Sequence, residues 1–277
     1  MMSSKSKQFI KEHVYDDSLI NFGLRNEKYL NAVIDALSDF DNDLNGRWRE
    51  LEHFGDADGC ILDMAAGVGS FVFRGLNRGY NVYGVEPEKW KLEYIQMRIE
   101  EEPKYFGFRD RVKYGLGEKL DFKDHMFDVV CTYQTLEHVQ DVAACIDELI
   151  RVTKPGGKIL IQAPDYCGFF EPHYLLPLLP NFNLAITKFF LRFLNRPSTG
   201  LKSINWITSN EIISYIGENY PGLKIINVRE NHHNKNVKSA MMKYHLPEFF
   251  IRSCLNFCKW IKSLRHCEDM YLVIRKL

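Results

Sequence analysis

The stretch ILDMAAGVGS, residues 61–70, constrains the fold of this chain more than any other feature of its sequence. An apolar run leads to Asp63, and a loop of small residues that includes Gly67 and Gly69 follows at once. The two glycines lack a Cβ, so the backbone can take positive φ angles and a ligand can approach it closely. A buried strand that ends in such a loop predicts an open α/β sheet, which binds ligands at the carboxyl ends of its strands.

Short β-rich runs alternate with helical patterns over the first 165 residues, which predicts a mostly parallel sheet with helices on both faces. The predicted strands are Cys60–Met64, Asn81–Val85, Phe127–Cys131 and Lys158–Gln162, and two later runs at Leu223–Val228 and Met270–Arg275 predict the last two strands. The clearest helical patterns are Glu88–Glu100 and Asp141–Val152, and the sequence KPGG at 154–157 predicts a turn after the second.

The composition limits the kinds of partner. With 277 residues, 45% of them hydrophobic, the chain can bury a large core, and we expect a single domain, 1–277. The 36 basic residues balance the 36 acidic ones, so no overall charge attracts nucleic acid, and we expect a small-molecule acceptor instead. The sequence has no signal peptide or membrane-span pattern, which predicts a cytoplasmic protein. Seven scattered cysteines predict reduced thiols, with Cys254 and Cys258 buried.

An acidic residue at the end of the second predicted strand narrows the ligand. Glu86, followed by Pro87, stands twenty-three positions after Asp63. A carboxylate there can accept hydrogen bonds from both hydroxyls of a ribose. A dinucleotide-binding loop needs a third glycine where Val72 stands, so NAD is disfavoured.

The spacing Asp-x-Ala-x-Gly-x-Gly resembles the first motif of class I S-adenosylmethionine-dependent methyltransferases, in which glycine usually occupies the place of Ala65. Four further stretches resemble motifs of that family in the same order: VEPEKW (85–90), YGLGEKLDF (114–122), FDVVCTYQTLEHV (127–139) and ELIRVTKPGGKILIQAPD (148–165). The resemblance covers about Cys60 to Asp165. It implies the Rossmann-like α/β fold of the class, a mostly parallel seven-stranded sheet with helices on both faces, whose last two strands form an antiparallel hairpin at the sheet edge.

The resemblance implies S-adenosylmethionine as cofactor and a set of residues around it. The set is Asp63, Ala65, Gly67, Gly69, Glu86, Pro87, Gly117, Glu118 and Thr132. By this comparison the loop glycines line the methionine part, Glu86 holds the ribose, and Gly117 with Glu118 lies at the adenine. Asp63 orders the loop or reaches the amino acid group through water.

Two positions depart from the family pattern. Ala65 carries a Cβ, so it must keep a negative φ or accept strain of about 1 kcal/mol. Leu116 stands where many relatives have an aspartate, which removes one expected contact with the adenine amino group.

Two histidines are candidate general bases for an acceptor hydroxyl. His138 follows the fourth predicted strand, and His173 lies just after the fifth, so both should face the same crevice. The alternative for each is a histidine that holds a loop through a backbone hydrogen bond. Quinone-type relatives with a similar Glu-His pair use an upstream glutamate to bind a divalent metal, but Gln134 stands there and is a weaker ligand for a hard cation, so we expect no required metal. His232 and His233 are assigned no role.

The segments outside the motifs are expected to choose the acceptor. Residues 1–55 predict an N-terminal helical lid, 56–165 the cofactor-binding core, 166–208 a roof over the acceptor, and 209–277 the closing strands with a helical insertion at 231–268. Residues 183–196 and 247–266 mix aromatic and basic side chains. This pattern suits a peripheral membrane contact, or alternatively packing against the domain or a dimer partner; the sequence leaves the oligomeric state open.

The stretch from EPHY to INWIT, within residues 171–208, resembles methyltransferases of bacterial glycan and lipid-linked sugar assembly. That resemblance implies methyl transfer to a hydroxyl of a sugar or a glycan-lipid intermediate. The alternative is a methyltransferase-like binding subunit without catalysis, which Ala65 and Leu116 favour.

Overall fold

The computed structural model describes residues 4–41, 43, 46–54, 59–167, 170–176, 183–228, 239, 247–263 and 269–276. Within them, seven strands form one sheet in the order β3-β2-β1-β4-β5-β7-β6. The strands are β1 (Cys60–Met64), β2 (Asn81–Glu86), β3 (Val112–Tyr114), β4 (Phe127–Tyr133), β5 (Thr153–Pro164), β6 (Lys224–Asn227) and β7 (Asp269–Arg275).

The sheet is mostly parallel, as predicted. Strands β1 to β5 pair in parallel, whereas β7 runs antiparallel to both β5 and β6. The strand β6 therefore forms the edge, in the predicted antiparallel pair with β7. The opposite edge strand, β3, was not predicted, because it has three residues and buries only Val112.

Most predicted boundaries lie within one or two residues of the observed ones, but β5 begins earlier than expected. Thr153 pairs with Phe127, and the next pair joins Lys158 to Val129. Residues 154–157, predicted as a turn, are thus a bulge inside the strand, with Gly156 at φ 80°. The glycine permits this left-handed conformation, so that pairing resumes after the bulge.

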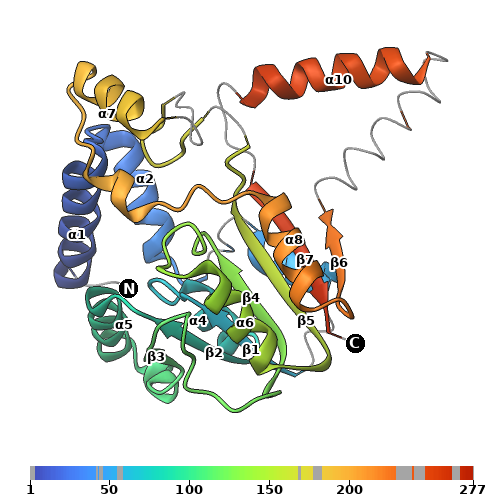
Figure 1. Cartoon of the computed structure of the whole chain (residues 1–277). Helices are drawn as coiled ribbons and strands as arrows, with labels where there is room; N and C mark the ends of the chain where they lie inside the picture. The colour runs from blue at the N-terminus through green and yellow to red at the C-terminus, as the bar shows by residue number, and fades with distance from the viewer. Residues whose placement is uncertain are drawn as a thin grey trace.

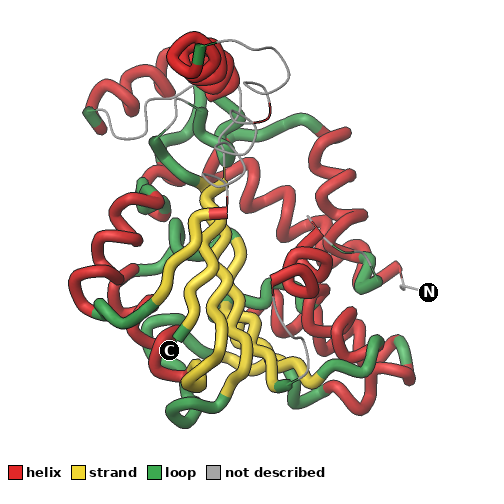
Figure 2. Tube along the Cα trace, turned by 90° about the vertical axis from the view of Figure 1, so that its right-hand side faces the viewer, coloured by secondary structure: helices red, strands yellow, loops and turns green. Residues whose placement is uncertain are grey.

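Helices cover both faces of the sheet (Figures 1 and 2). The helical segments are α1 (Ser4–Phe22), α2 (Glu27–Ser38), α3 (Arg47–Phe54), α4 (Ser70–Asn77), α5 (Lys89–Glu101), η2 (Pro103–Phe108), α6 (Val142–Val152), α7 (Leu184–Phe193), η3 (Thr199–Ser203), α8 (Ser209–Asn219) and α10 (Glu248–Ser263). Asp141 caps α6 by accepting the Ala144 N–H at 3.0 Å, and Thr208 and Glu211 form a capping box on α8.

Two hydrophobic cores form, one on each face. The first joins α6 and α8 to the sheet through residues such as Leu149, Ile212 and Ile161. The second joins the N-terminal helices, α4 and α5 to the other face, with Trp48 and Phe73 fully buried. Both faces of the parallel strands are therefore buried, which explains why their sequences are continuous apolar runs rather than alternating ones.

The end of α1 is held by the segment around α7. The Arg196 guanidinium donates to the Phe22 carbonyl at 2.7 Å and to the Tyr174 carbonyl at 3.1 Å. The Tyr174 hydroxyl donates to the Asn21 carbonyl at 3.3 Å, and the Phe22 ring stacks on His173 with 5.4 Å between centroids. The N-terminal helix is thus fixed against the residues that surround a predicted site histidine.

The helices α7 and α10 lie at the same end of the molecule, at the top of Figure 1. Many of their large apolar side chains are exposed, among them Phe189, Phe193, Phe249 and Trp260. Among the described residues, we find no helix with the length and apolar character needed to cross a bilayer.

One expectation for this region was wrong, and part of another lies outside the described residues. Cys254 and Cys258 are exposed rather than buried, because among the α10 side chains that the structure describes only Ile251 is buried. Most of the predicted insertion 231–268, including His232 and His233, lies outside the described residues.

Candidate functional site

Most predicted cofactor residues meet around a cavity of about 400 Å³ at the carboxyl ends of β1, β2 and β4. Six of the nine line it: Ala65, Gly67, Glu86, Pro87, Gly117 and Glu118. Leu37 of α2 and Arg47 of α3 line it as well, so the N-terminal helices form part of its wall. The cavity lies where open α/β sheets bind their ligands.

The loop after β1 takes the conformation that its small residues allow. Gly67 has φ 60°, and a Cβ built on it would meet no atom within 4 Å, because its α-carbon faces open space. Ala65 has φ 62°, so it accepts the strain that the sequence left as one of two options. Gln134, which also lines the cavity, is left-handed too, at φ 53°. Strained residues of this kind often gather at binding sites.

Glu86 ties the loop to the end of β2. One of its carboxylate oxygens accepts the Gly67 N–H at 2.7 Å and the other accepts the Glu88 N–H at 3.0 Å. Burial raises the pKa of Glu86, although the ammonium of Lys91, 3.7 Å away, opposes that shift. Each oxygen keeps a second lone pair, so the carboxylate can hold the loop and still accept hydroxyls.

The other three predicted residues are not among the described lining residues but support them. Asp63 and Thr132 are buried, and within the described part of the chain their side-chain oxygens have no hydrogen-bond partner. Burial raises the pKa of Asp63 to about 7. Gly69 caps α4 at φ 84°, where a Cβ would lie 2.8 Å from the Phe73 ring.

The predicted adenine side is built around Gly117. A Cβ there would come within 2.9 Å of the Met64 sulfur, so a larger residue would have to displace that buried side chain. Glu118 accepts the Gln140 N–H at 2.8 Å, which joins this loop to the segment after β4. Leu116 lines the cavity and is 46% exposed, so it offers an apolar surface at the predicted adenine side.

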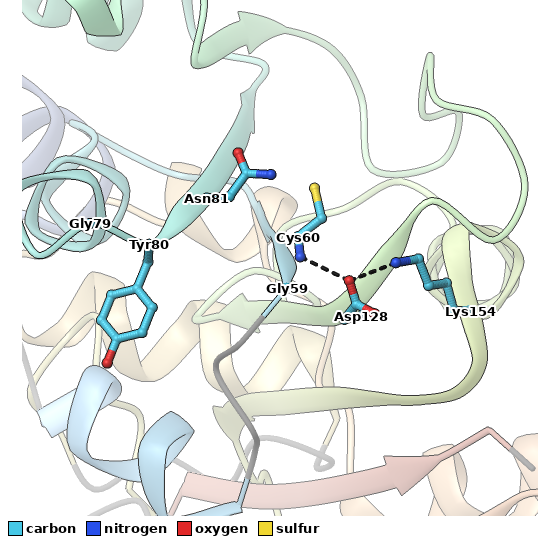
Figure 3. Close-up of a pocket in the computed structure, with 7 residues that line it drawn as sticks. All are labelled: Gly59, Cys60, Gly79, Tyr80, Asn81, Asp128 and Lys154. Atoms are coloured by element: carbon cyan, nitrogen blue, oxygen red, sulfur yellow. Dashed lines mark hydrogen bonds and ion pairs between the residues drawn. The ribbon is translucent and has the colours of Figure 1, made fainter.

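A second hollow, of about 530 Å³, lies at the opposite end of the strands (Figure 3). It opens where β1, β2 and β4 begin, beside Cys60 and Asn81. Its one carboxylate, Asp128, already accepts the Cys60 N–H at 2.8 Å and pairs with Lys154 at 2.7 Å. The groups are satisfied by each other, so this hollow is a poor candidate for the functional site.

The two predicted histidines come together. His138 lines the cavity, and its Nε2 lies 3.1 Å from Nε2 of His173. The Nδ1 of His138 is 2.9 Å from the Ser203 carbonyl, and the Nδ1 of His173 is 2.7 Å from a Glu171 carboxylate oxygen. Burial, together with the neighbouring His173, lowers the pKa of His138. In His173, Glu171 outweighs burial and raises the pKa.

Two carboxylates at this pair were not assigned roles from the sequence. Glu171 is fully buried and also accepts the Tyr174 N–H at 2.6 Å. Glu137 is fully buried too, and burial raises its pKa to about 7. The sequence does contain a signal for these two carboxylates, because an acidic residue stands close to each histidine, in Glu137-His138 and in Glu171-Pro172-His173.

Residues 62–161 match the family model described as a methyltransferase domain. Together with the seven-stranded sheet and the loop geometry above, this match supports a class I S-adenosylmethionine-dependent methyltransferase domain over these residues. The predicted fold is therefore confirmed, and the predicted methyltransferase resemblance, with S-adenosylmethionine as its cofactor, is supported over the matched segment.

Individual relatives match only part of the chain. An uncharacterized methyltransferase of Schizosaccharomyces pombe is 31% identical over 170 residues, 57% of this chain and 57% of its own length. Norajmaline N-methyltransferase of Rauvolfia serpentina is 32% identical over 104 residues, 36% of this chain and 34% of its own. The chain thus covers less than two thirds of either relative.

A solved structure matches the whole chain. The structure, from Galdieria sulphuraria and provisionally assigned as a sarcosine dimethylglycine methyltransferase, has a TM-score of 0.52 and 17% identity, and covers 99% of this chain and 98% of its own. At that identity the similarity supports the fold alone.

Proposed function

We propose that this protein transfers a methyl group from S-adenosylmethionine to a small-molecule acceptor, a hydroxyl of a sugar or of a glycan-lipid intermediate. The observation that carries the proposal is the presence in one cavity of the loop after β1, Glu86 and His138. The proposed cofactor site and the candidate base His138 therefore share one cavity.

The residues around the cavity fit the cofactor. Gly67 leaves room for the methionine part, and the buried Glu86 carboxylate is placed for the ribose hydroxyls. Bound S-adenosylmethionine would supply a methyl group on a positively charged sulfur, and transfer forms the O–C bond as the S–C bond breaks, with the electron pair left on sulfur. The hydroxyl proton passes to the neutral imidazole of His138, which lines the cavity. The helices that contribute Leu37 and Arg47 to the wall serve as the lid that excludes bulk water.

The acceptor would lie between the cavity and the roof. His138 faces the cavity, while His173 belongs to the roof segment, so the histidine pair marks the boundary between the two. The histidine pair is the candidate general base for the acceptor hydroxyl. The names of the relatives refer to different acceptors, so the choice of a sugar rests on the resemblance of the roof sequence.

A glycan-lipid acceptor would require access to a bilayer surface, and α7 suits that contact. Phe189 and Phe193 are 72% and 79% exposed, and the exposed charges of this helix, Lys188 and Arg192, are both basic. We expect the protein to co-sediment with vesicles that contain phosphatidylserine and to lose most of this binding when both phenylalanines are replaced by serine. Phe106→Ser, an exposed phenylalanine on η2, is the matched control. Concentration-dependent dimerisation without vesicle binding would contradict the membrane contact.

Calorimetric titration with S-adenosylhomocysteine, with NAD as control, tests the proposed activity first. Saturable binding of S-adenosylhomocysteine alone, followed by methyl transfer to a sugar or glycolipid, is the expected result. Binding without transfer to any acceptor, or no binding at all, would favour the binding-subunit alternative.

A further inference from the structure

We propose that Glu137, His138 and His173 form a binding site for one divalent transition-metal ion, with Zn²⁺ as the reference ion. Each residue offers one ligand atom, and these atoms all lie within 4.8 Å of one another. The first two follow β4, and the third comes from the roof segment after β5. The site therefore exists only where these two segments meet.

The hydrogen bonds of the histidines leave both Nε2 atoms as acceptors. The Nδ1 of His138 faces the Ser203 carbonyl, and the Nδ1 of His173 faces the Glu171 carboxylate; both partners only accept, so each Nδ1 carries the hydrogen. A neutral imidazole with a protonated Nδ1 has a lone pair on Nε2. Two such lone pairs face each other at 3.1 Å. This arrangement requires a positively charged group between them, either a shared proton or a metal ion.

The environment of Glu137 favours a metal ion over a shared proton. Its side chain is fully buried, and within the described residues neither carboxylate oxygen accepts a hydrogen bond from another residue. A proton shared by the imidazoles would leave this carboxylate without a partner, which is a costly state for a buried polar group. A metal ion satisfies all three groups at once.

The geometry and chemistry of the three ligands favour a transition metal. With bond lengths of about 2.0–2.1 Å, two nitrogens on a tetrahedral Zn²⁺ are about 3.4 Å apart, close to the distance observed here. Two imidazoles and one carboxylate suit Zn²⁺, Mn²⁺ or Fe²⁺, whereas Mg²⁺ and Ca²⁺ prefer oxygen ligands.

The surroundings support the same assignment. Glu171 holds His173 through Nδ1, which is the common arrangement of a carboxylate behind a metal-binding histidine. Glu171 is itself fully buried and accepts the Tyr174 N–H at 2.6 Å, so the carboxylate that orients His173 is held in place.

The role of the ion in catalysis rests on the proposed methyl transfer. Three protein ligands leave at least one coordination position open, and His138 places the ion at the edge of the cavity. An acceptor hydroxyl bound there would lose its proton to water more readily, because the ion lowers its pKa. The histidines then act as ligands rather than as bases. The sequence predicted no required metal because Gln134 is a weak ligand for a hard cation. It could not show that His173, 35 residues after His138, would lie beside it.

Metal binding is tested directly, without methyl transfer. The apoprotein, prepared with a chelator, is titrated with Zn²⁺ by calorimetry, and we expect one ion per chain. His173→Ala and Glu137→Gln should weaken binding at least about 100-fold, and Glu171→Gln about 10- to 100-fold. His53→Ala, an exposed histidine of α3, is the control and should bind as the wild type does. Mg²⁺ should not bind saturably at the same concentrations.

Two outcomes would overturn the proposal: no saturable Zn²⁺ binding by the wild type, or unchanged affinity in folded Glu137→Gln. If that variant does not fold, the visible absorption of Co²⁺ added to the wild type gives the answer, because a spectrum identical to that of the hydrated ion would exclude the site. Titration of the same samples with S-adenosylhomocysteine separates the two proposals. Binding of S-adenosylhomocysteine without binding of Zn²⁺ refutes only the metal site. Binding of Zn²⁺ without binding of S-adenosylhomocysteine refutes only the methyltransferase function.

Discussion

Replacing Asp63 by asparagine removes a buried carboxyl group from beneath the cofactor loop. Burial raises the pKa of Asp63 from 3.8 to about 7; the charge of Arg47 opposes this shift, and that of Glu86 adds to it. In the unfolded chain the pKa is ordinary, so between about pH 4 and pH 7 the folded state keeps a proton that the unfolded state has lost. The contribution of this group to folding stability is therefore present at low pH and is lost as the pH rises through that window.

The structure sets the size of this effect. A pKa difference of about three corresponds to about 4 kcal/mol in the free energy of unfolding. Asparagine has nearly the same shape and does not titrate. Relative to the wild type, Asp63→Asn should therefore become more stable by about 4 kcal/mol between pH 4 and pH 8. Urea unfolding followed by circular dichroism at each pH measures the free energy of unfolding of both proteins. Distant groups titrate alike in the two proteins, so their contribution cancels in the difference.

Asp128→Asn is the matched control, because its pKa is shifted in the other direction. Partial burial acts to raise the pKa of Asp128, but Lys154 and the Cys60 N–H together hold it below the usual value. This variant should lose stability relative to the wild type as the pH rises from about 3 to 5. A difference for Asp63→Asn that does not vary with pH would refute the reasoning, since Asp63 would then be ionised in the folded state.

Three further substitutions test the site. Glu86→Ala should weaken S-adenosylhomocysteine binding by a few kcal/mol at most, because it removes an acceptor for ribose hydroxyls and for the Gly67 N–H; unchanged calorimetric affinity would disprove the placement of Glu86. Ala65→Gly should raise the free energy of unfolding by about 1 kcal/mol through relief of the left-handed strain, whereas Ala66→Gly, next to it, should lower that free energy. His173→Ala should keep S-adenosylhomocysteine binding but reduce turnover at least about 100-fold, and full activity would remove it from the acceptor site.

The cofactor half of the site could be predicted because its signals are local. The loop after β1 and the acid at the end of β2 follow from a strand, a turn and a spacing, and parallel strands bring their carboxyl ends to one edge of the sheet. The sign of φ at Ala65 could not be predicted, because the choice between strain and a different turn depends on the packing around the loop.

The acceptor half required contacts that no local pattern contains. Both histidines were predicted to face one crevice, yet the contacts of Glu171 depend on how the chain folds after β5. The unpartnered state of Glu137 likewise depends on what packs around it. The bulge at 154–157 was missed for a different reason: a glycine-rich stretch predicts a turn equally well whether or not the strand continues beyond it.

The attachment of α1 to the roof also has a consequence for the order of folding. The cofactor loop and Glu86 lie within about 25 residues of each other, whereas the bond from Tyr174 to Asn21 closes a loop of 153 residues and the bond from Arg196 to Phe22 one of 174. Long loops close later, because their entropic cost must be met before their contacts form. We therefore expect a newly made chain to bind its cofactor before its acceptor face is complete, so that bound cofactor can stabilise the half-formed protein while the N-terminal helix finds its place.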